Sequence, residues 1–406
     1  MKDMDLGAVG MDRAASRAAG QPREILLRLL AGVSFLIFAQ AFMVAPLIPR
    51  LASLFAVPAR SIALSVPAYL IPYGAATLLY GPISDRLGRW PVMRASLTAF
   101  VLLTAATTAV SSAGMFIAAR VATGLGASGV VPVALALVGD LFPYQQRGRA
   151  LGWLFGAMAG GMAVGSTAGA LLERSLGWRA LFWGVAALAV LAGVPLLRRS
   201  TAERPAGPAP DARAAVGASL ALLRAPRARR TYAYVLLNAI FHSGIFTWLG
   251  VYFVRGYGLG EVGIGLALLG YGVPGFLLGP SMGRLADRWG RGRMIPLGLS
   301  VAALSAVALA ARPPLLVAAT AVTTLSLGYD LVQPALAAIV TDLGRERGLG
   351  MGLNVFTLFT GFGLGSLALE ALLGLHLATA FGLFGLGALV AALAGVRLFR
   401  SELPHS

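Results

Sequence analysis

Long apolar segments joined by short polar connections are the feature that most limits how this chain can fold. Hydrophobic residues make up 58% of the 406 residues and charged residues only 12%, whereas a soluble protein of this length needs more charge to cover its surface. A membrane-spanning helix needs roughly 20 apolar residues. Twelve segments fit this description: 26–49, 62–82, 92–111, 114–139, 147–172, 178–197, 231–254, 262–282, 294–311, 314–340, 349–372 and 376–397. The sequence therefore predicts an all-α integral membrane protein with twelve transmembrane helices.

A nine-residue pattern, G-x-x-x-D-R-x-G-R, occurs twice at an offset of half the chain, each time in a basic turn between two apolar segments. Its two copies consist of Gly81, Asp85, Arg86, Gly88 and Arg89, and of Gly283, Asp287, Arg288, Gly290 and Arg291. A basic turn does not by itself require this repetition, so the repeat predicts two similar halves. We expect an N-terminal tail (1–25), a six-helix half (26–197), a Pro/Ala/Arg-rich linker (198–230), a second six-helix half (231–397) and a short tail (398–406). We expect the N-terminal tail to be disordered.

At these residues the chain resembles the major facilitator superfamily, whose signature loop joins helices 2 and 3 and helices 8 and 9. The resemblance implies two pseudo-symmetric halves that rock around a midplane site by alternating access. It also implies that helices 1, 4, 7 and 10 line the central cavity. Six residues on those helices then become candidates for the substrate or proton pathway: Gln40, Arg120, Asn238, His242, Asp330 and Gln333.

Basic residues are distributed very unevenly over the two sides of the predicted bundle. By these helix boundaries 26 of the 33 Lys and Arg residues fall on one side and six on the other, with Arg120 inside a span. Cytoplasmic loops are the ones that carry excess positive charge. The pattern predicts that both termini lie in the cytoplasm, and we expect a multi-pass protein of a bacterial inner membrane. It assigns the net charge of +17 to topology and anionic lipid rather than to nucleic acid, and we expect a monomer.

Signatures of enzymatic chemistry are missing from the sequence. It has no cysteine and three histidines, and it contains no H-E-x-x-H, G-x-S-x-G or Walker pattern. Residues 124–129 match G-x-G-x-x-G, but inside an apolar segment and without the preceding strand that a dinucleotide site requires. We expect no enzyme, no cofactor and no metal. A non-transporting membrane sensor remains a minor alternative.

Ionisable residues at membrane depth are costly and are candidates for function by default. Asp330 is the clearest of these, with a hydrogen-bonded structural role as its alternative. Arg120 with Gly124 resembles the helix 4 motif R-x-x-Q-G of the family's drug antiporters, with Thr123 in place of Gln; the alternative is an arginine that extends to the membrane surface. Residues 161–170 resemble the antiporter motif G-x-x-x-G-P-x-x-G-G but carry Ser166 and Ala170 where the motif has Pro and Gly.

Two contacts between the halves follow from the repeat. We expect Asp85 to lie at the start of helix 11, near residues 348–352, and Asp287 at the start of helix 5, near residues 148–152. A helix start has unpaired N–H groups and partial positive charge, which favour a carboxylate. Each contact is expected to hold the halves closed on the cytoplasmic side.

Depths along the helices give further expectations. Arg120 and Asp330 lie six and sixteen residues from the outer ends of their helices, roughly 9 and 24 Å at about 1.5 Å per residue, so we expect no ion pair between them. His242, Asp330 and Gln40 are expected to share one layer, with Asn238 one turn below His242.

The function favoured by the sequence is proton-coupled export of an amphipathic drug or metabolite. A sugar or organic-anion permease is the alternative. Aromatic residues on helices 2 and 7, among them Tyr69, Tyr73, Phe241 and Phe246, either line a pocket or pack between helices. An aromatic pocket favours drugs, and a pocket of polar side chains favours sugars.

Overall fold

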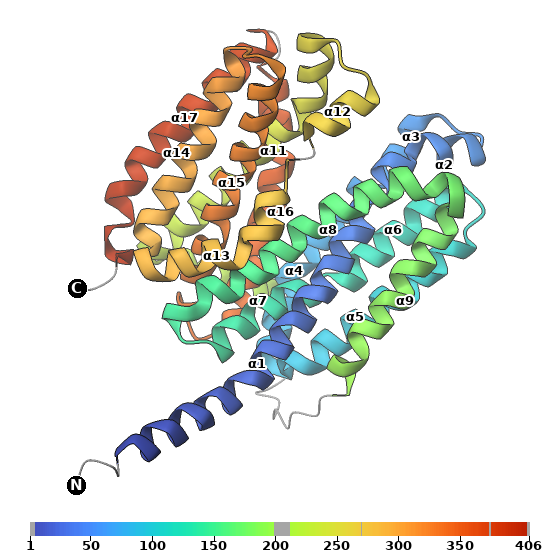
Figure 1. Ribbon diagram of the computed structural model, residues 1–406. Helices are drawn as coiled ribbons and strands as arrows, with labels where there is room; N and C mark the ends of the chain where they lie inside the picture. Colours follow the sequence, from blue (N-terminus) through green and yellow to red (C-terminus); the bar gives the residue numbers. More distant parts are fainter. Residues whose placement is uncertain (1–4, 199–211, 269, 373–374, 404–406) are drawn as a thin grey trace.

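The computed structural model describes residues 5–198, 212–268, 270–372 and 375–403, and these form helices and short connections with no strand. Figure 1 shows two helical halves that meet along α8 and α13. The N-terminal half contains α1 (Asp5–Phe42), η1 (Ala45–Leu47), α2 (Ile48–Leu54), α3 (Ala59–Ala63), α4 (Pro67–Leu87), α5 (Arg89–Ala106), η2 (Thr107–Ala109), α6 (Ala113–Ala127), α7 (Val130–Leu141), η3 (Tyr144–Gln146), α8 (Arg147–Leu176) and α9 (Trp178–Leu197). After the linker helix α10 (Ala212–Leu222), the C-terminal half contains α11 (Pro226–Tyr257), α12 (Glu261–Leu268), α13 (Val273–Trp289), α14 (Arg291–Ala310), α15 (Leu315–Val340), α16 (Arg347–Glu370), α17 (Leu377–Leu398) and η5 (Arg400–Glu402).

Eleven stretches of the described chain are helical, long and apolar enough to cross a membrane. Helix α8 supplies the twelfth transmembrane helix of the predicted fold. It carries seven glycines among 30 residues. Those glycines serve helix packing, since close contact between membrane helices favours small residues over large apolar ones.

Three predicted segments differ in the structure. Helix α1 begins at Asp5, so the tail expected to be disordered continues the first helix from that residue on; alanines are frequent there, and alanine favours a helix. The predicted helix 4 is divided into α6 and α7 by a turn at 128–129, and the predicted helix 8 into α12 and α13. Residues 1–4, most of the linker (199–211) and the last three residues of the predicted C-terminal tail lie outside the described part of the chain.

The second glycine of each nine-residue pattern ends a helix. Gly88 and Gly290 have φ values of 94° and 87°, a conformation that side chains other than glycine's strongly disfavour. They stop α4 and α13 and allow α5 and α14 to start at the next residue. The repeat thus encodes a tight turn at equivalent places in both halves.

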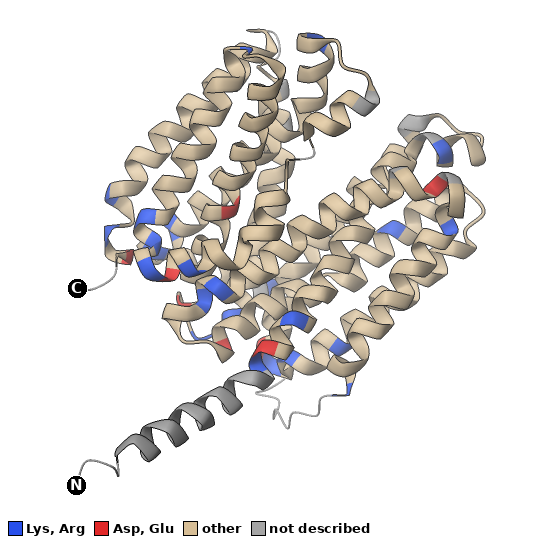
Figure 2. Ribbon diagram, in the orientation of Figure 1, with Lys and Arg blue, Asp and Glu red and all other residues tan. Residues whose placement is uncertain are grey.

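The four turns and connections at Gly88, 142–146, Gly290 and 341–346 lie at one end of the bundle, which we call the basic side. Figure 2 shows Lys and Arg gathered at this end, with few at the opposite end, the distal side. The uneven distribution predicted from the sequence is therefore present in three dimensions.

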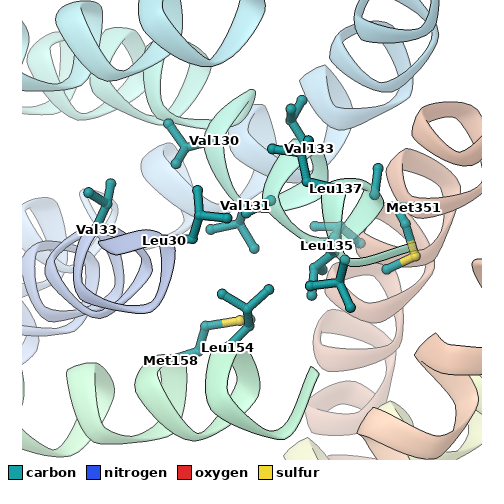
Figure 3. Close-up of a cluster of buried hydrophobic side chains, with 14 of the residues drawn as sticks. Leu30, Val33, Val130, Val131, Val133, Leu135, Leu137, Leu154, Met158 and Met351 are labelled. Atoms are coloured by element: carbon teal, nitrogen blue, oxygen red, sulfur yellow. The ribbon is translucent and has the colours of Figure 1, made fainter. Parts of the chain in front are cut away.

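Helix α7 lies at the centre of the largest apolar cluster, which joins the two halves. Figure 3 shows Val130, Val131, Val133, Leu135 and Leu137 of α7 against residues of α1, α8 and α16. These neighbours are Leu30 and Val33 of α1, Leu154 and Met158 of α8, and Met351 of α16. Because Met351 belongs to the C-terminal half, the cluster is part of the contact between the halves as well as a core.

Candidate functional site

Two aspartates cap helices of the opposite half on the basic side. Asp85 accepts hydrogen bonds from the backbone N–H groups of Gly348 (2.9 Å) and Leu349 (2.7 Å) at the start of α16. Asp287 accepts them from Gly148 and Arg149 at the start of α8, both at 2.9 Å. Both contacts expected from the repeat are present. They satisfy helix N–H groups that have no partner within the helix.

The arginines of the pattern extend these contacts. Arg89 pairs with Asp85 (2.6 Å) and Asp140 (3.0 Å), and Arg291 pairs with Asp287 (3.0 Å). Arg86 and Arg288, in contrast, are exposed on the basic side. Two further ion pairs cross between the halves, from Arg347 to Asp140 (2.6 Å) and from Arg147 to Asp342 (3.6 Å).

A third contact was not expected from the sequence. Glu402, in the C-terminal tail, is buried and accepts hydrogen bonds from Arg227 (2.8 Å), Arg230 (2.5 Å) and the Tyr144 hydroxyl (3.1 Å). Tyr144 belongs to the N-terminal half, and the Arg291 guanidinium lies 3.8 Å from the centre of its ring. The tail therefore fastens the C-terminal half to the connection between helices 4 and 5. Only an acidic residue shortly after the last span hinted at this in the sequence.

Replacing Asp85 by Asn is expected to shift the equilibrium toward conformers that are open on the basic side by roughly fivefold to thirtyfold. This corresponds to about 1–2 kcal/mol for removing a partly buried negative charge from a helix start. Because the chain has no cysteine, spin labels at Gln145→Cys and Arg345→Cys would report the separation of the halves by pulsed electron resonance. Arg86→Gln is the control, since it removes an exposed charge of the same pattern. An unchanged distance distribution in Asp85→Asn would contradict a gating role.

Glu402 gives a prediction for stability. Burial opposes its ionisation, but hydrogen bonds and charge from Arg227, together with Tyr144 and Arg230, outweigh burial and lower the pKa of this carboxyl. A carboxyl with a lowered pKa stabilises the fold above its unfolded pKa and loses this contribution as the pH falls through the folded one. Glu402→Gln is therefore expected to cost about 1.5–3 kcal/mol at pH 7 and progressively less below about pH 4. Thermal unfolding in detergent across this range, with the exposed Glu346→Gln as control, measures it; a deficit that stays constant as the pH falls would contradict it.

A cavity of about 570 Å³ lies between the halves. Its lining comes from the distal part of α4 and the middle of α11 and α16, with Phe42 and Met162 added from α1 and α8. Most of the lining is apolar, and it includes five phenylalanines: Phe42, Phe246, Phe356, Phe359 and Phe362. Contacts nearer the basic side close it there, because Thr77 donates a hydrogen bond to the Gly352 carbonyl (3.0 Å) and the backbones of Gly81 and Gly348 touch.

Only His242 among the six predicted pathway residues lines this cavity. The expectation that helices 1, 4, 7 and 10 form its wall is therefore largely wrong, since α4, α11 and α16 (helices 2, 7 and 11) supply most of it. Asn238, one turn from His242, is buried and donates to Gln333 (3.3 Å). Those two amides join α11 to α15 away from the cavity.

Arg120 is fully buried at 0% exposure rather than extended to the surface. It donates to Gln40 Oε1 (2.9 Å), the Ala41 carbonyl (3.0 Å) and the Ser65 carbonyl (3.3 Å), and it lies 4.2 Å from the centre of the Tyr69 ring. These partners all belong to the N-terminal half. No ion pair with Asp330 occurs among the described residues, as the depths of the two side chains predict. The expectation that Gln40 shares a layer with His242 and Asp330 is wrong, because Gln40 lies beside Arg120 near the distal ends of α1 and α4.

Asp330 is buried on α15 and accepts a hydrogen bond from the Ser326 hydroxyl (3.2 Å). Its carboxylate lies over Gly275, where a Cβ would come within 2.7 Å of both oxygens. His242 does not contact it directly. Tyr329, the residue before Asp330, instead places its ring 3.8 Å from the His242 ring.

Comparison with known proteins agrees with this architecture. Residues 30–366 and 261–406 match the family model described as Major Facilitator Superfamily. The chain is 28% identical over 334 residues to the MFS-type transporter YwfA of Bacillus subtilis, covering 80% of each chain. It is 27% identical over 270 residues to a chloramphenicol resistance protein of Pseudomonas aeruginosa, covering 65% of this chain and 63% of that protein. The fold is similar to that of the human organic anion transporter MFSD10, with a TM-score of 0.77 at 18% identity over 92% of this chain and 99% of that one.

Proposed function

Because the chain belongs to the major facilitator superfamily, we propose that it is a proton-coupled transporter that exports an amphipathic aromatic molecule by alternating access. The observation that carries this proposal is the cavity between the two halves, with phenylalanines from three helices and His242 as a polar group in its wall. Sites for drug-sized ligands are mostly apolar clefts of about 300–1,000 Å³ with a few placed polar groups, and this cavity has that size and character.

The cavity lining also distinguishes among substrate classes. A sugar presents hydroxyls all round and needs many hydrogen-bonding partners, whereas the polar side chains here are His242, Ser243, Thr247 and Thr360. An organic anion needs a counter-charge, and no Lys or Arg is among the described residues of the lining. The names of a chloramphenicol and a puromycin resistance protein among the relatives support the same choice.

We also propose which residue couples transport to protons and which side of the protein faces the cytoplasm. Asp330 is a buried carboxylate next to Tyr329, whose ring packs on His242 of the cavity wall, and it binds and releases the coupling proton. The basic side faces the cytoplasm of a bacterium, by the rule that relates positive loops to topology. The described conformer is then closed toward the cytoplasm, with its cavity on the outward side of the closing contacts.

The test is a flux measurement in proteoliposomes with and without a gradient of two pH units. Chloramphenicol and puromycin are the export probes, and xylose and p-aminohippurate represent the sugar and organic-anion alternatives. We expect the gradient to drive counter-movement of an export probe and a protonophore to abolish it. Gradient-driven movement of only xylose or the anion would overturn the proposal, as would the absence of flux of every probe.

A further inference from the structure

Helix 8 is interrupted within the membrane-spanning region. Helix α12 ends at Leu268 and α13 begins at Val273. Gly272, the residue that caps α13, has a φ of +80°, which glycine adopts at little cost. The start of α13, with its unpaired N–H groups and partial positive charge, therefore lies inside the protein.

Hydrogen bonds connect one side of this interruption to Asp330. The Gly272 N–H donates to the Ser326 hydroxyl (2.9 Å), and that hydroxyl donates to Asp330 Oδ2 (3.2 Å). The Asp330 carboxylate also lies against the backbone of Gly275 in the first turn of α13. The start of α13 and the Ser326 hydroxyl favour the ionised carboxylate, whereas burial of the side chain opposes ionisation.

Tyr271, the residue before Gly272, contacts two residues of the cavity wall. The Tyr271 hydroxyl lies 2.6 Å from Nε2 of His242, and its ring packs on Phe246 with centres 4.2 Å apart. His242 and Phe246 both line the cavity. Adjacent residues of one short segment thus contact the cavity wall and the buried carboxylate.

We propose that Gly270–Gly272 is the element that couples cavity occupancy to protonation of Asp330, with Tyr271 and Ser326 as its positioning residues. When Asp330 is ionised, Ser326 and the start of α13 hold the segment in place. A proton on Asp330 removes the negative charge that favours this arrangement, and the segment moves together with Tyr271 and His242. By thermodynamic reciprocity, a ligand that displaces His242 changes the proton affinity of Asp330 to the same degree.

Two features allow a change of charge on Asp330 to affect the rest of the protein. The titratable side chains facing Asp330 are Tyr271 and Tyr329, with His242 behind them, and no described Lys or Arg forms an ion pair with it. The charge on Asp330 is therefore not fixed by a permanent partner. Helix α13 also packs on α8 of the other half, with Gly275 against Gly156, so movement of its start reaches the surface between the halves.

The first test needs no substrate, so it is independent of the proposed function on which this inference rests. Hydrogen exchange in nanodiscs would follow the backbone amides of residues 270–276. We expect exchange about five- to tenfold faster in both Ser326→Ala and Asp330→Asn, because the first removes the acceptor of the Gly272 N–H and the second removes the negative charge at the start of α13. Ser305→Ala is the matched control, because it removes a buried hydroxyl that bonds Val301 of α14 and Thr324 of α15 rather than the segment or Asp330. Unchanged protection in Ser326→Ala would overturn the inference.

The second test measures coupling through the dissociation constant of chloramphenicol at pH 6, 7 and 8. We expect a pH-dependent constant in the wild type and Ser305→Ala, and a change of less than about twofold over this range in Ser326→Ala and Tyr271→Phe. Full pH dependence in both variants, or none in the wild type, would overturn the coupling. If the wild type binds no probe, the proposed substrate class is wrong, and the hydrogen-exchange result still decides whether Ser326 holds the segment.

Discussion

Transport by the Asp330→Asn variant is expected to be independent of the pH gradient. A gradient of two pH units supplies about 2.7 kcal/mol per proton, or roughly 100-fold accumulation at equilibrium, and the variant should lose all of it while still equilibrating its substrate. Asparagine has nearly the same shape as aspartate and keeps a hydrogen-bond acceptor for Ser326, so the fold should persist. The physical reason is that Asp330 is a carboxylate buried beside the cavity wall without an ion-pair partner in the described chain.

Proteoliposomes would measure accumulation of chloramphenicol or puromycin with and without the gradient. Glu173→Gln is the control, because it removes a carboxylate near the distal end of α8 that pairs with the exposed Arg50 (3.1 Å). Gradient-driven accumulation that persists in Asp330→Asn would exclude this residue as the proton carrier, whatever its role in the structure.

Replacing Gly152 by Val is expected to prevent closure on the basic side and to reduce transport by roughly 100-fold. A Cβ at this position would collide with the Gly279 carbonyl of α13. Both partners are helix backbone, so neither has a flexible side chain that moves aside. A forced separation costs about 3 kcal/mol or more, and this cost falls only on the conformer in which the two helices touch.

The same spin-label pair that tests Asp85 would report the closed fraction. Gly184→Val is the matched control, because a Cβ there meets nothing within 4 Å and lies on an exposed part of α9. A Gly152→Val protein that closes and transports normally would show that the contact between α8 and α13 is not needed for alternating access. Loss of transport in both variants would instead indicate a general effect of valine in these helices.

Some contacts of the candidate site are encoded by local sequence patterns, whereas others depend on which helix faces meet. The contacts of Asp85 and Asp287 were predictable, because a repeated motif places a carboxylate at one helix end and the repeat supplies a helix start for it to cap. The lack of an Arg120–Asp330 ion pair was predictable from depth alone. The pairing of Arg120 with Gln40, however, required knowing that α1, α4 and α6 meet near their distal ends.

By itself the sequence determined twelve membrane-length helices, two similar halves and one basic side, because the bilayer requires long apolar helices and places positive loops by charge. Only the tertiary structure decided where those helices break and what they enclose. Helix 8 (α12 and α13) and α8 are both rich in glycine, and glycines of both pack against neighbouring backbone, yet only helix 8 is interrupted by one, at Gly272. The aromatic cavity and the docking of Glu402 likewise depend on residues far apart in the chain. Such features arise from close packing between helices, and a helix's own periodicity does not specify its partner.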